Sequence, residues 1–130
     1  MNNLLEVKNL CLKIKSNKDE KVLKDISFKI RKSEVVSLIG ESGSGKSLTA
    51  LSIIRLLEKS CKIINGEVVF LSKDLLQLEE KEMRQIRRHD ISMIFQEPMR
   101  SLNPVMSIRD QLRESYENIK KEDIDREIID

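Results

Sequence analysis

No stretch of this 130-residue sequence approaches the roughly 18 to 20 consecutive apolar residues that cross a bilayer, and its N-terminus lacks an apolar run of signal-peptide length. We therefore expect any link to a membrane to pass through a partner. The sequence also has little excess charge, because 24 Lys and Arg side chains are balanced by 22 Asp and Glu, for a net charge of +2. This balance argues against an electrostatic surface for nucleic acid or anionic lipid.

Cysteine and histidine are scarce. Cys11 and Cys61 are fifty positions apart with no CxxC pair, so neither a disulfide framework nor a metal site is indicated. We expect both to be free thiols in a reducing cytoplasm. The single histidine, His89, has no carboxylate or nucleophile at a spacing that suggests catalysis, so we interpret it as a solvated turn residue.

Apolar and polar residues alternate over residues 4–14 and 22–30, with a polar stretch between them. This pattern predicts two antiparallel strands joined by an exposed loop. Residues 34–39, EVVSLI, are instead almost continuously apolar and β-branched. Such a run is typical of a strand that is buried on both faces.

Helical spacing of apolar residues begins at Leu48 and continues to about Ser60. The Asn-Gly pair at 65 and 66 then predicts a turn before the strand-like EVVFL. Residues 78–88 are charged and helix-favouring, and their arginines and glutamates together predict a solvated helix face.

A second buried strand is predicted over residues 91–95, ISMIF, and a last helix over 107–129. Ser107 and Asp110 have the spacing of a capping box for that helix. The helix pattern runs to the end of the sequence without a glycine cap or a proline. We therefore expect a chain that is cut rather than finished.

The sequence GESGSGKS matches the pattern G-x-x-x-x-G-K-[ST], in which backbone N–H groups of a small-residue loop converge on phosphate oxygens at a helix N-terminus. Lys46 would reach the β- and γ-phosphates, and the Ser47 hydroxyl would ligate Mg²⁺. The candidate nucleotide-binding residues are Gly40, Glu41, Ser42, Gly43, Ser44, Gly45, Lys46 and Ser47. A loop of this kind identifies a phosphate site but not the process that it drives.

A second motif follows about fifty residues later, in ISMIFQEPMRSLNP. An apolar strand here delivers Gln96 and Glu97 to its C-terminal end, which is the edge where open α/β sheets place their ligands. Gln96 would ligate Mg²⁺ or position water, and it is the candidate catalytic residue.

In order and spacing, LLEVKNL, VLKDISFKI, GESGSGKS and ISMIFQEPMRSLNPVMSI resemble the N-terminal half of the ATP-binding subunits of ABC transporters, most closely those of oligopeptide, dipeptide and nickel importers. The resemblance implies an α/β P-loop NTPase core with an antiparallel β subdomain, so that residues 1–130 are the N-terminal part of one nucleotide-binding domain. It also implies ATP and Mg²⁺ as cofactors, and ATP hydrolysis coupled to import of peptides or a related small solute.

The resemblance further implies partners: transmembrane permease subunits, a second ATP-binding subunit, and a peripheral place on the cytoplasmic face of the membrane. In that family, the glutamine at the position of Gln96 contacts magnesium and the attacking water. The segment after it, 97–106 here, lines the groove where the transmembrane partner docks.

Three departures from the family pattern stand out. Ile14 lies where the family usually stacks an aromatic ring on adenine, and Arg100 lies where a small hydroxyl residue is more common. The signature motif, the Walker B strand end with its catalytic glutamate, and the switch histidine are absent from residues 1–130. Two alternatives therefore stay open, a non-catalytic remnant that binds only nucleotide or a partner, and another small P-loop kinase or NTPase.

Overall fold

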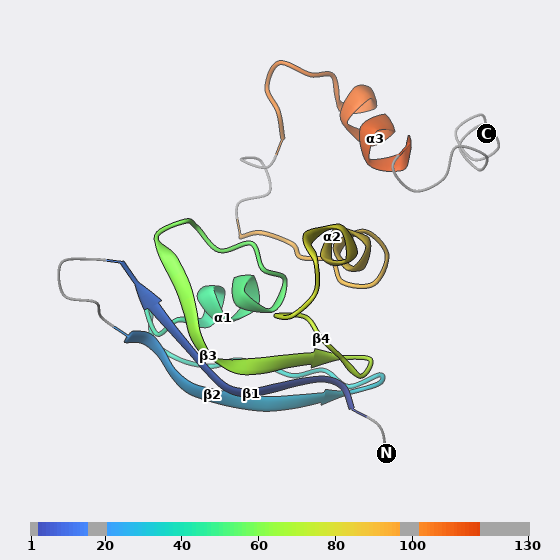
Figure 1. Ribbon diagram of the computed structural model, residues 1–130. Coiled ribbons are helices and arrows are strands. Elements are labelled where there is room, and N and C mark those ends of the chain that lie inside the picture. The colour runs from blue at the N-terminus through green and yellow to red at the C-terminus, as the bar shows by residue number, and fades with distance from the viewer. Residues whose placement is uncertain (1–2, 16–20, 97–101, 118–130) are drawn as a thin grey trace. The chain divides into compact units, whose positions relative to one another are not determined.

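The computed structural model describes residues 3–15, 21–96 and 102–117, and the chain divides into two units, Met1–Met83 and Arg84–Asp130. Figure 1 labels the helices and strands. In chain order these are β1 (Asn3–Ile14), β2 (Lys21–Arg31), α1 (Lys46–Ile53), β3 (Cys61–Phe70), β4 (Lys73–Asp74), α2 (Glu80–His89) and α3 (Ile108–Glu117).

A four-stranded sheet forms the first unit, with the strand order β2-β1-β3-β4 and antiparallel pairing throughout. The predicted pair of strands is confirmed as β1 and β2, while residues 16–20 between them lie outside the described residues. Helix α1 lies over one face of this sheet (Figure 1). The sheet therefore supports the helix that begins at the glycine-rich loop.

The apolar pattern of β1 changes phase in mid-strand because the strand bulges. Val7 and Leu10 are both buried although three positions separate them, and the left-handed Asn9 between them has φ 47°. Gly66 lies against this bulge in β3 with φ 115°, and a Cβ there would come within 2.6 Å of the Leu10 Cα. The predicted turn at 65–66 is wrong, because the glycine is needed for close backbone approach inside a strand.

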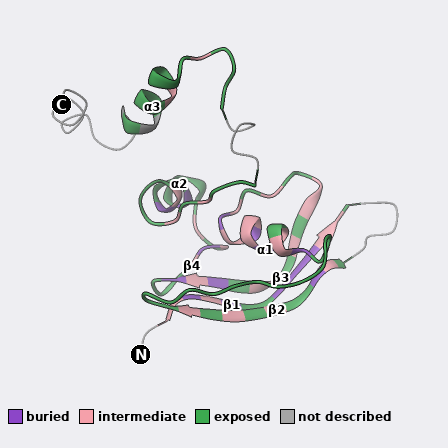
Figure 2. Ribbon diagram, turned by 180° about the vertical axis from the view of Figure 1, so that it is seen from behind, coloured by how far each residue is buried: buried purple, intermediate pink, exposed green. Residues whose placement is uncertain are grey.

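Buried residues lie both in the sheet and in the segments that pack on it (Figure 2). In the first unit the buried apolar residues are Leu5, Val7, Leu10, Cys11, Leu12, Leu23, Ile54, Val68, Phe70, Leu75 and Met83. Cys11 and Cys61 are free thiols, as predicted. The Cys11 Sγ lies 3.2 Å from the Asp25 Oδ1, so this thiol is held inside the sheet structure.

Ion pairs join directly opposed residues on the sheet. The Lys29 Nζ lies 2.8 Å from the Glu6 Oε1, and its hydrogen bond lowers the pKa of the Glu6 carboxyl. The Lys8 Nζ lies 3.1 Å from the Glu67 Oε2, and this hydrogen bond raises the pKa of the Lys8 ammonium. Opposite charges at facing positions favour this register of the strands.

Both predicted buried strands are wrong in this structure. Residues 34–39 belong to no strand, and Val35 and Ile39 are 93% and 95% exposed. Residues 91–95 likewise form no strand, and Ile94 is 91% exposed. A central strand needs neighbours on both edges, and the described residues supply none for either segment.

Helix α1 ends at Ile53, earlier than the predicted Ser60. Arg55 takes a left-handed φ of 55°, and the N–H groups of Arg55 and Leu56 donate to the Ser52 and Leu51 carbonyls. This is the Schellman arrangement that usually requires glycine. The Arg55 guanidinium stabilises it by donating to the carbonyls of Leu75 and Leu78, at 3.1 and 2.6 Å.

The later helices agree with the sequence. The charged helix is confirmed as α2, with its last residue His89 exposed rather than in a turn. The cap of α3 is confirmed, because the Asp110 N–H donates to the Ser107 Oγ at 3.1 Å. Residues 118–130 lie outside the described residues. None of the helices described is long and apolar enough to cross a bilayer.

Candidate nucleotide-binding site

Residues 40–47 comprise a loop and the first two residues of α1, and together we call them the loop 40–47. The Ser44 N–H donates to the Glu41 carbonyl at 3.2 Å, which closes a tight turn. Gly45 is the N-cap of α1, and its carbonyl accepts from both the N–H and the Oγ1 of Thr49, at 2.8 and 3.0 Å. The buried Thr49 thus fixes the point at which the loop becomes a helix.

The backbone conformation or a close contact favours glycine at each of the three glycine positions in the loop. Gly43 and Gly45 have left-handed φ values of 81° and 91°, which side chains disfavour. A Cβ on Gly45 would also collide with the Cδ2 of Leu23, a buried residue of β2. A Cβ on Gly40 would come within 2.7 Å of the Ser44 Oγ. The loop therefore needs glycine for its shape, independently of any ligand.

The start of α1 presents free hydrogen-bond donors. Within the part of the chain that the structure describes, no group accepts a hydrogen bond from the backbone N–H of Lys46, Ser47 or Leu48. The Ser47 side chain is exposed beside them. Unpaired N–H groups at a helix N-terminus carry a partial positive charge of about half a unit, so this end of α1 favours an anion.

The Lys46 side chain folds back over the loop. Its Nζ lies 2.8 Å from the Gly40 carbonyl oxygen, 2.7 Å from the Glu41 carbonyl oxygen and 3.2 Å from the Ser44 Oγ. Three acceptors thus meet the three donors of the ammonium group. The loop and its lysine form one unit, and a phosphate that binds Lys46 has to replace at least one of these contacts.

These donors fit a magnesium nucleotide by their chemistry. Backbone N–H groups and a lysine ammonium bind phosphate oxygens, while a serine hydroxyl is a hard oxygen ligand of the kind that Mg²⁺ accepts. The exposed loop also leaves room for a ligand, since Gly40 through Ser44 are all exposed. The residues predicted over 40–47 are therefore gathered in one loop of the first unit.

Gln96 belongs to the second unit, where its side chain is exposed. Its roles as a magnesium ligand and catalytic residue stay predictions. The neighbouring residues 97–101, which include Arg100, lie outside the described residues.

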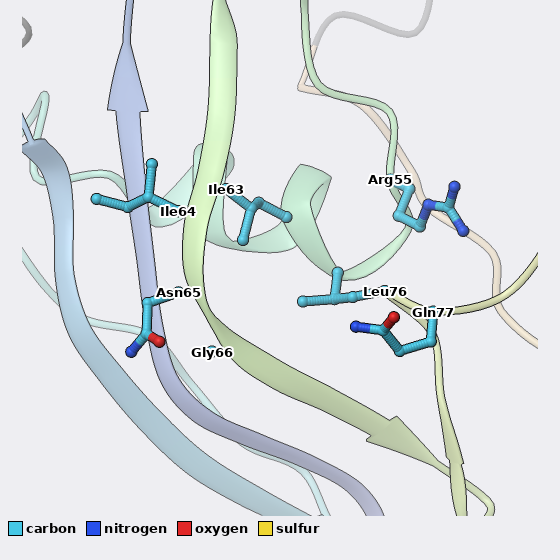
Figure 3. Close-up of a pocket in the computed structure, with 7 residues that line it drawn as sticks. All are labelled: Arg55, Ile63, Ile64, Asn65, Gly66, Leu76 and Gln77. Atoms are coloured by element: carbon cyan, nitrogen blue, oxygen red, sulfur yellow. The ribbon is translucent and has the colours of Figure 1, made fainter.

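A separate pocket of about 330 Å³ lies in the first unit (Figure 3). It is lined by Arg55, Ile63, Ile64, Asn65, Gly66, Leu76 and Gln77. Figure 3 shows Leu76 and Gln77 on a connecting segment opposite β3, with the Arg55 guanidinium turned away from the other labelled side chains. None of these residues belongs to the loop 40–47, so the pocket is distinct from the candidate nucleotide-binding site.

Sequence reasoning assigned no role to Leu23 or Thr49, yet both shape the loop. Leu23 packs against Gly45 from a strand more than twenty positions earlier, a contact for which the sequence has no local signal. Thr49 was detectable in principle, because it follows Gly45 by the four positions that bring a side chain back to a helix cap.

Comparison with known proteins agrees with this geometry. Residues 23–129 match the family described as ABC transporter. The chain belongs to the ABC transporter family. The matched residues include the loop 40–47, Gln96 and most of the sequence segments that resemble this family.

Curated relatives within the ABC transporter family are transport proteins. The chain is 48% identical over 100 residues to the dipeptide transport ATP-binding protein DppD of Bacillus subtilis, covering 76% of this chain and 30% of that protein. It is 44% identical over 128 residues to the oligopeptide transport ATP-binding protein AppD of the same species, and this match covers 95% of this chain and 39% of that protein. The chain thus spans about a third of the length of these relatives.

A solved structure confirms the fold class. An ATP-binding cassette, determined as a dimer in a post-hydrolysis state with ADP and phosphate, superposes with a TM-score of 0.60 at 27% identity. The match covers 87% of this chain and 54% of that one. The mixed α/β architecture with its antiparallel sheet is therefore that of part of an ABC ATPase domain.

Proposed function

We propose that this chain is part of the ATP-binding component of an ABC transporter that imports peptides or a related small solute. The observation that carries the proposal is the loop 40–47, with unpaired N–H groups at the start of α1 beside Lys46 and Ser47. ATP would be held by these N–H groups and the Lys46 ammonium. Mg²⁺, with Ser47 and Gln96 as its protein ligands, would offset the negative charge of the phosphates.

Peptides are favoured as the transported solute because of the relatives. DppD and AppD of B. subtilis are named for dipeptide and oligopeptide transport, and they share 48% and 44% of their aligned residues with this chain. In such a transporter, transmembrane permease subunits and a second ATP-binding subunit would be the partners. The chain would then lie on the cytoplasmic face of the membrane, attached only through those partners.

Nucleotide binding is tested by titration of the 130-residue chain with a fluorescent ATP analogue and Mg²⁺. Lys46→Ala removes a charge-assisted contact to phosphate, so we expect affinity to fall at least tenfold. Lys73→Ala removes an exposed lysine from β4 and serves as the matched control. Equal affinity in the wild type and Lys46→Ala would refute phosphate binding by this loop.

The residue at position 14 bears on nucleotide choice. Ile14 offers no aromatic ring to stack on a base, so we expect only a weak preference for ATP over GTP in the same titration. A preference of a hundredfold or more would contradict a role of this position in base selection.

ATP hydrolysis belongs to the complete domain in our proposal, and we expect negligible turnover by the 130-residue chain alone. Phosphoryl transfer to water depends on several positioned groups at once, and removing some of them costs orders of magnitude in rate. Phosphate release by the purified chain tests this expectation, with Lys46→Ala as the control for contaminating ATPase. Multiple turnovers per minute that disappear in Lys46→Ala would overturn it.

Docking to a transmembrane partner is proposed for residues 97–106. Of the described residues in this segment, Val105 is 88% exposed and suits a crosslinking probe. Val105→Cys, in a chain whose Cys61 is replaced by serine, should crosslink to a permease subunit in a reconstituted transporter. Lys24→Cys on β2 is the control site. An adduct from Lys24→Cys but none from Val105→Cys would contradict the proposed contact.

A further inference from the structure

One edge of the sheet is open along β3. Strand β4 is two residues long and pairs with β3 only at Val69 and Phe70. Within the described part of the chain, no strand pairs with residues 62–67 on the side away from β1. We call this stretch the open edge of β3, and at the usual rise per residue it is about 20 Å long.

The backbone on either side of the open edge already has partners. The Cys61 N–H donates to the Glu58 carbonyl at 2.9 Å, and the Val68 N–H donates to the Asp74 Oδ1 at 3.3 Å. Hydrogen bonding alternates along an antiparallel strand, so Ile63, two positions after Cys61, also directs its N–H and C=O away from β1. No described residue bonds to these two groups of Ile63. A strand added at this edge would pair with them.

The pocket of about 330 Å³ lies beside the open edge. Figure 3 shows the Ile63 side chain directed toward Leu76 across this pocket, and the Ile64 side chain directed to the other side of β3. On the opposite wall, the N–H groups of Leu76 and Gln77 already donate to the Oδ1 and the carbonyl of Asp74, at 3.0 and 3.2 Å. The pocket therefore combines an open strand edge on one wall with an apolar side chain on the other.

Lysines face one another in a row that ends at the open edge. Lys21 of β2 is opposite Lys13 of β1, and Lys13 is opposite Lys62 of β3. The two ion pairs of the sheet join facing residues of opposite charge, whereas like charges at facing positions are destabilising. Lys62 is exposed, and none of the ion pairs among the described residues includes it. The next position in the row, on a strand added beside β3, would face Lys62 and favour a carboxylate.

We propose that the open edge of β3 binds an extended segment of a partner protein in which acidic and apolar residues alternate. Its backbone pairs with Ile63, and an acidic side chain faces Lys62 on one side of the sheet. The apolar side chains next to that acid point to the other side, where they enter the pocket against Leu76. The occupant is a polypeptide because nucleotides and lipid headgroups have no N–H and C=O groups at strand spacing. None of these residues belongs to the loop 40–47, so the inference does not depend on nucleotide binding.

The probe is a capped pentapeptide in which valine and glutamate alternate, titrated into the isotope-labelled 130-residue chain. We expect saturable shifts of the N–H signals of residues 62–67, and amide exchange of Ile63 slowed about tenfold at saturation. The same peptide with proline as its central residue lacks one N–H and should bind roughly tenfold more weakly. Binding that is insensitive to the proline, or signals of residues 62–67 that do not move, would refute strand addition.

Charge reversal at Lys62 provides a matched comparison. Lys62→Glu should weaken the glutamate peptide roughly fivefold and strengthen a peptide with lysine in place of glutamate by a similar factor. Lys24→Glu, at an exposed lysine of β2 that β1 separates from β3, should leave both affinities unchanged. Lys62→Glu should keep the sheet, because it replaces facing like charges with opposite ones, and amide exchange of β1 checks this. Equal effects of the two variants would overturn the assigned contact with Lys62.

Two further outcomes decide the occupant and the independence of the site. If the chain alone sediments as a dimer with the Ile63 amide protected, the occupant is a second copy and our assignment is wrong. If the peptide protects Ile63 while Lys46→Ala leaves nucleotide affinity unchanged, the strand-addition site stands and the proposed phosphate site fails.

Discussion

The sharpest prediction compares one substitution at two glycines of the phosphate loop. Gly43→Ala and Gly45→Ala each add a methyl group at a left-handed residue, with φ of 81° and 91°. A Cβ on Gly43 meets nothing within 4 Å, while a Cβ on Gly45 collides with the Cδ2 of Leu23. The two variants therefore share the backbone cost and differ in steric cost.

The magnitudes follow from these two environments. A left-handed conformation destabilises the folded state of an alanine variant by about 1–2 kcal/mol. Replacing glycine with alanine also restricts the unfolded chain, which offsets about 0.4–1 kcal/mol of that cost. Gly43→Ala should therefore lower the free energy of unfolding by about 1 kcal/mol. Gly45→Ala adds overpacking against buried Leu23, worth about 1–3 kcal/mol. The total loss for Gly45→Ala is about 2–4 kcal/mol.

Urea unfolding of the 130-residue chain, followed by far-ultraviolet circular dichroism, measures both variants. Leu23→Val shortens the obstructing side chain, so in that background the cost of Gly45→Ala should fall toward that of Gly43→Ala. The reasoning is refuted if the two glycine variants are equally unstable, or if Leu23→Val leaves the difference between them unchanged.

Four other outcomes follow from single contacts. Leu10→Ala empties a fully buried site and should lower the free energy of unfolding by about 2–5 kcal/mol in the same urea experiment. Arg55→Met removes the two hydrogen bonds to the Leu75 and Leu78 carbonyls and should cost about 1–3 kcal/mol, whereas exchange of the exposed Arg88 for methionine should cost little. Ser107→Ala removes the cap of α3 and should reduce helical circular dichroism, at a cost of about 1 kcal/mol, and Ser107→Asp should restore it. Lys29→Ala should raise the pKa of Glu6, as measured by NMR titration, because it removes the hydrogen bond that lowers this pKa. The lowered pKa stabilises the fold above the unfolded pKa of Glu6, and this contribution is lost as the pH falls through the folded pKa. An unchanged Glu6 pKa would contradict the assigned cause.

The position of residues 40–47 before α1 was predictable from the sequence because the signal is local, while phosphate binding by these residues stays a prediction. Gly40 through Ser47 supply the small residues, the cation and the hydroxyl within eight consecutive positions, and the structure places them in one loop before α1. The β1–β2 pair and the cap at Ser107 were predictable for the same reason, since alternation and cap spacing involve neighbouring residues. Gln96 was identified only by its motif, and its catalytic role stays a prediction.

Only the tertiary structure decided the features that depend on distant partners. Gly66 lies in a strand rather than a turn because the bulge of β1 at Asn9 lies against it. Helix α1 stops at Ile53 because the Arg55 guanidinium donates hydrogen bonds to carbonyls 20 and 23 residues away in the sequence. Residues 34–39 have the sequence of a buried strand yet remain exposed, because a strand forms only when another segment supplies its hydrogen bonds.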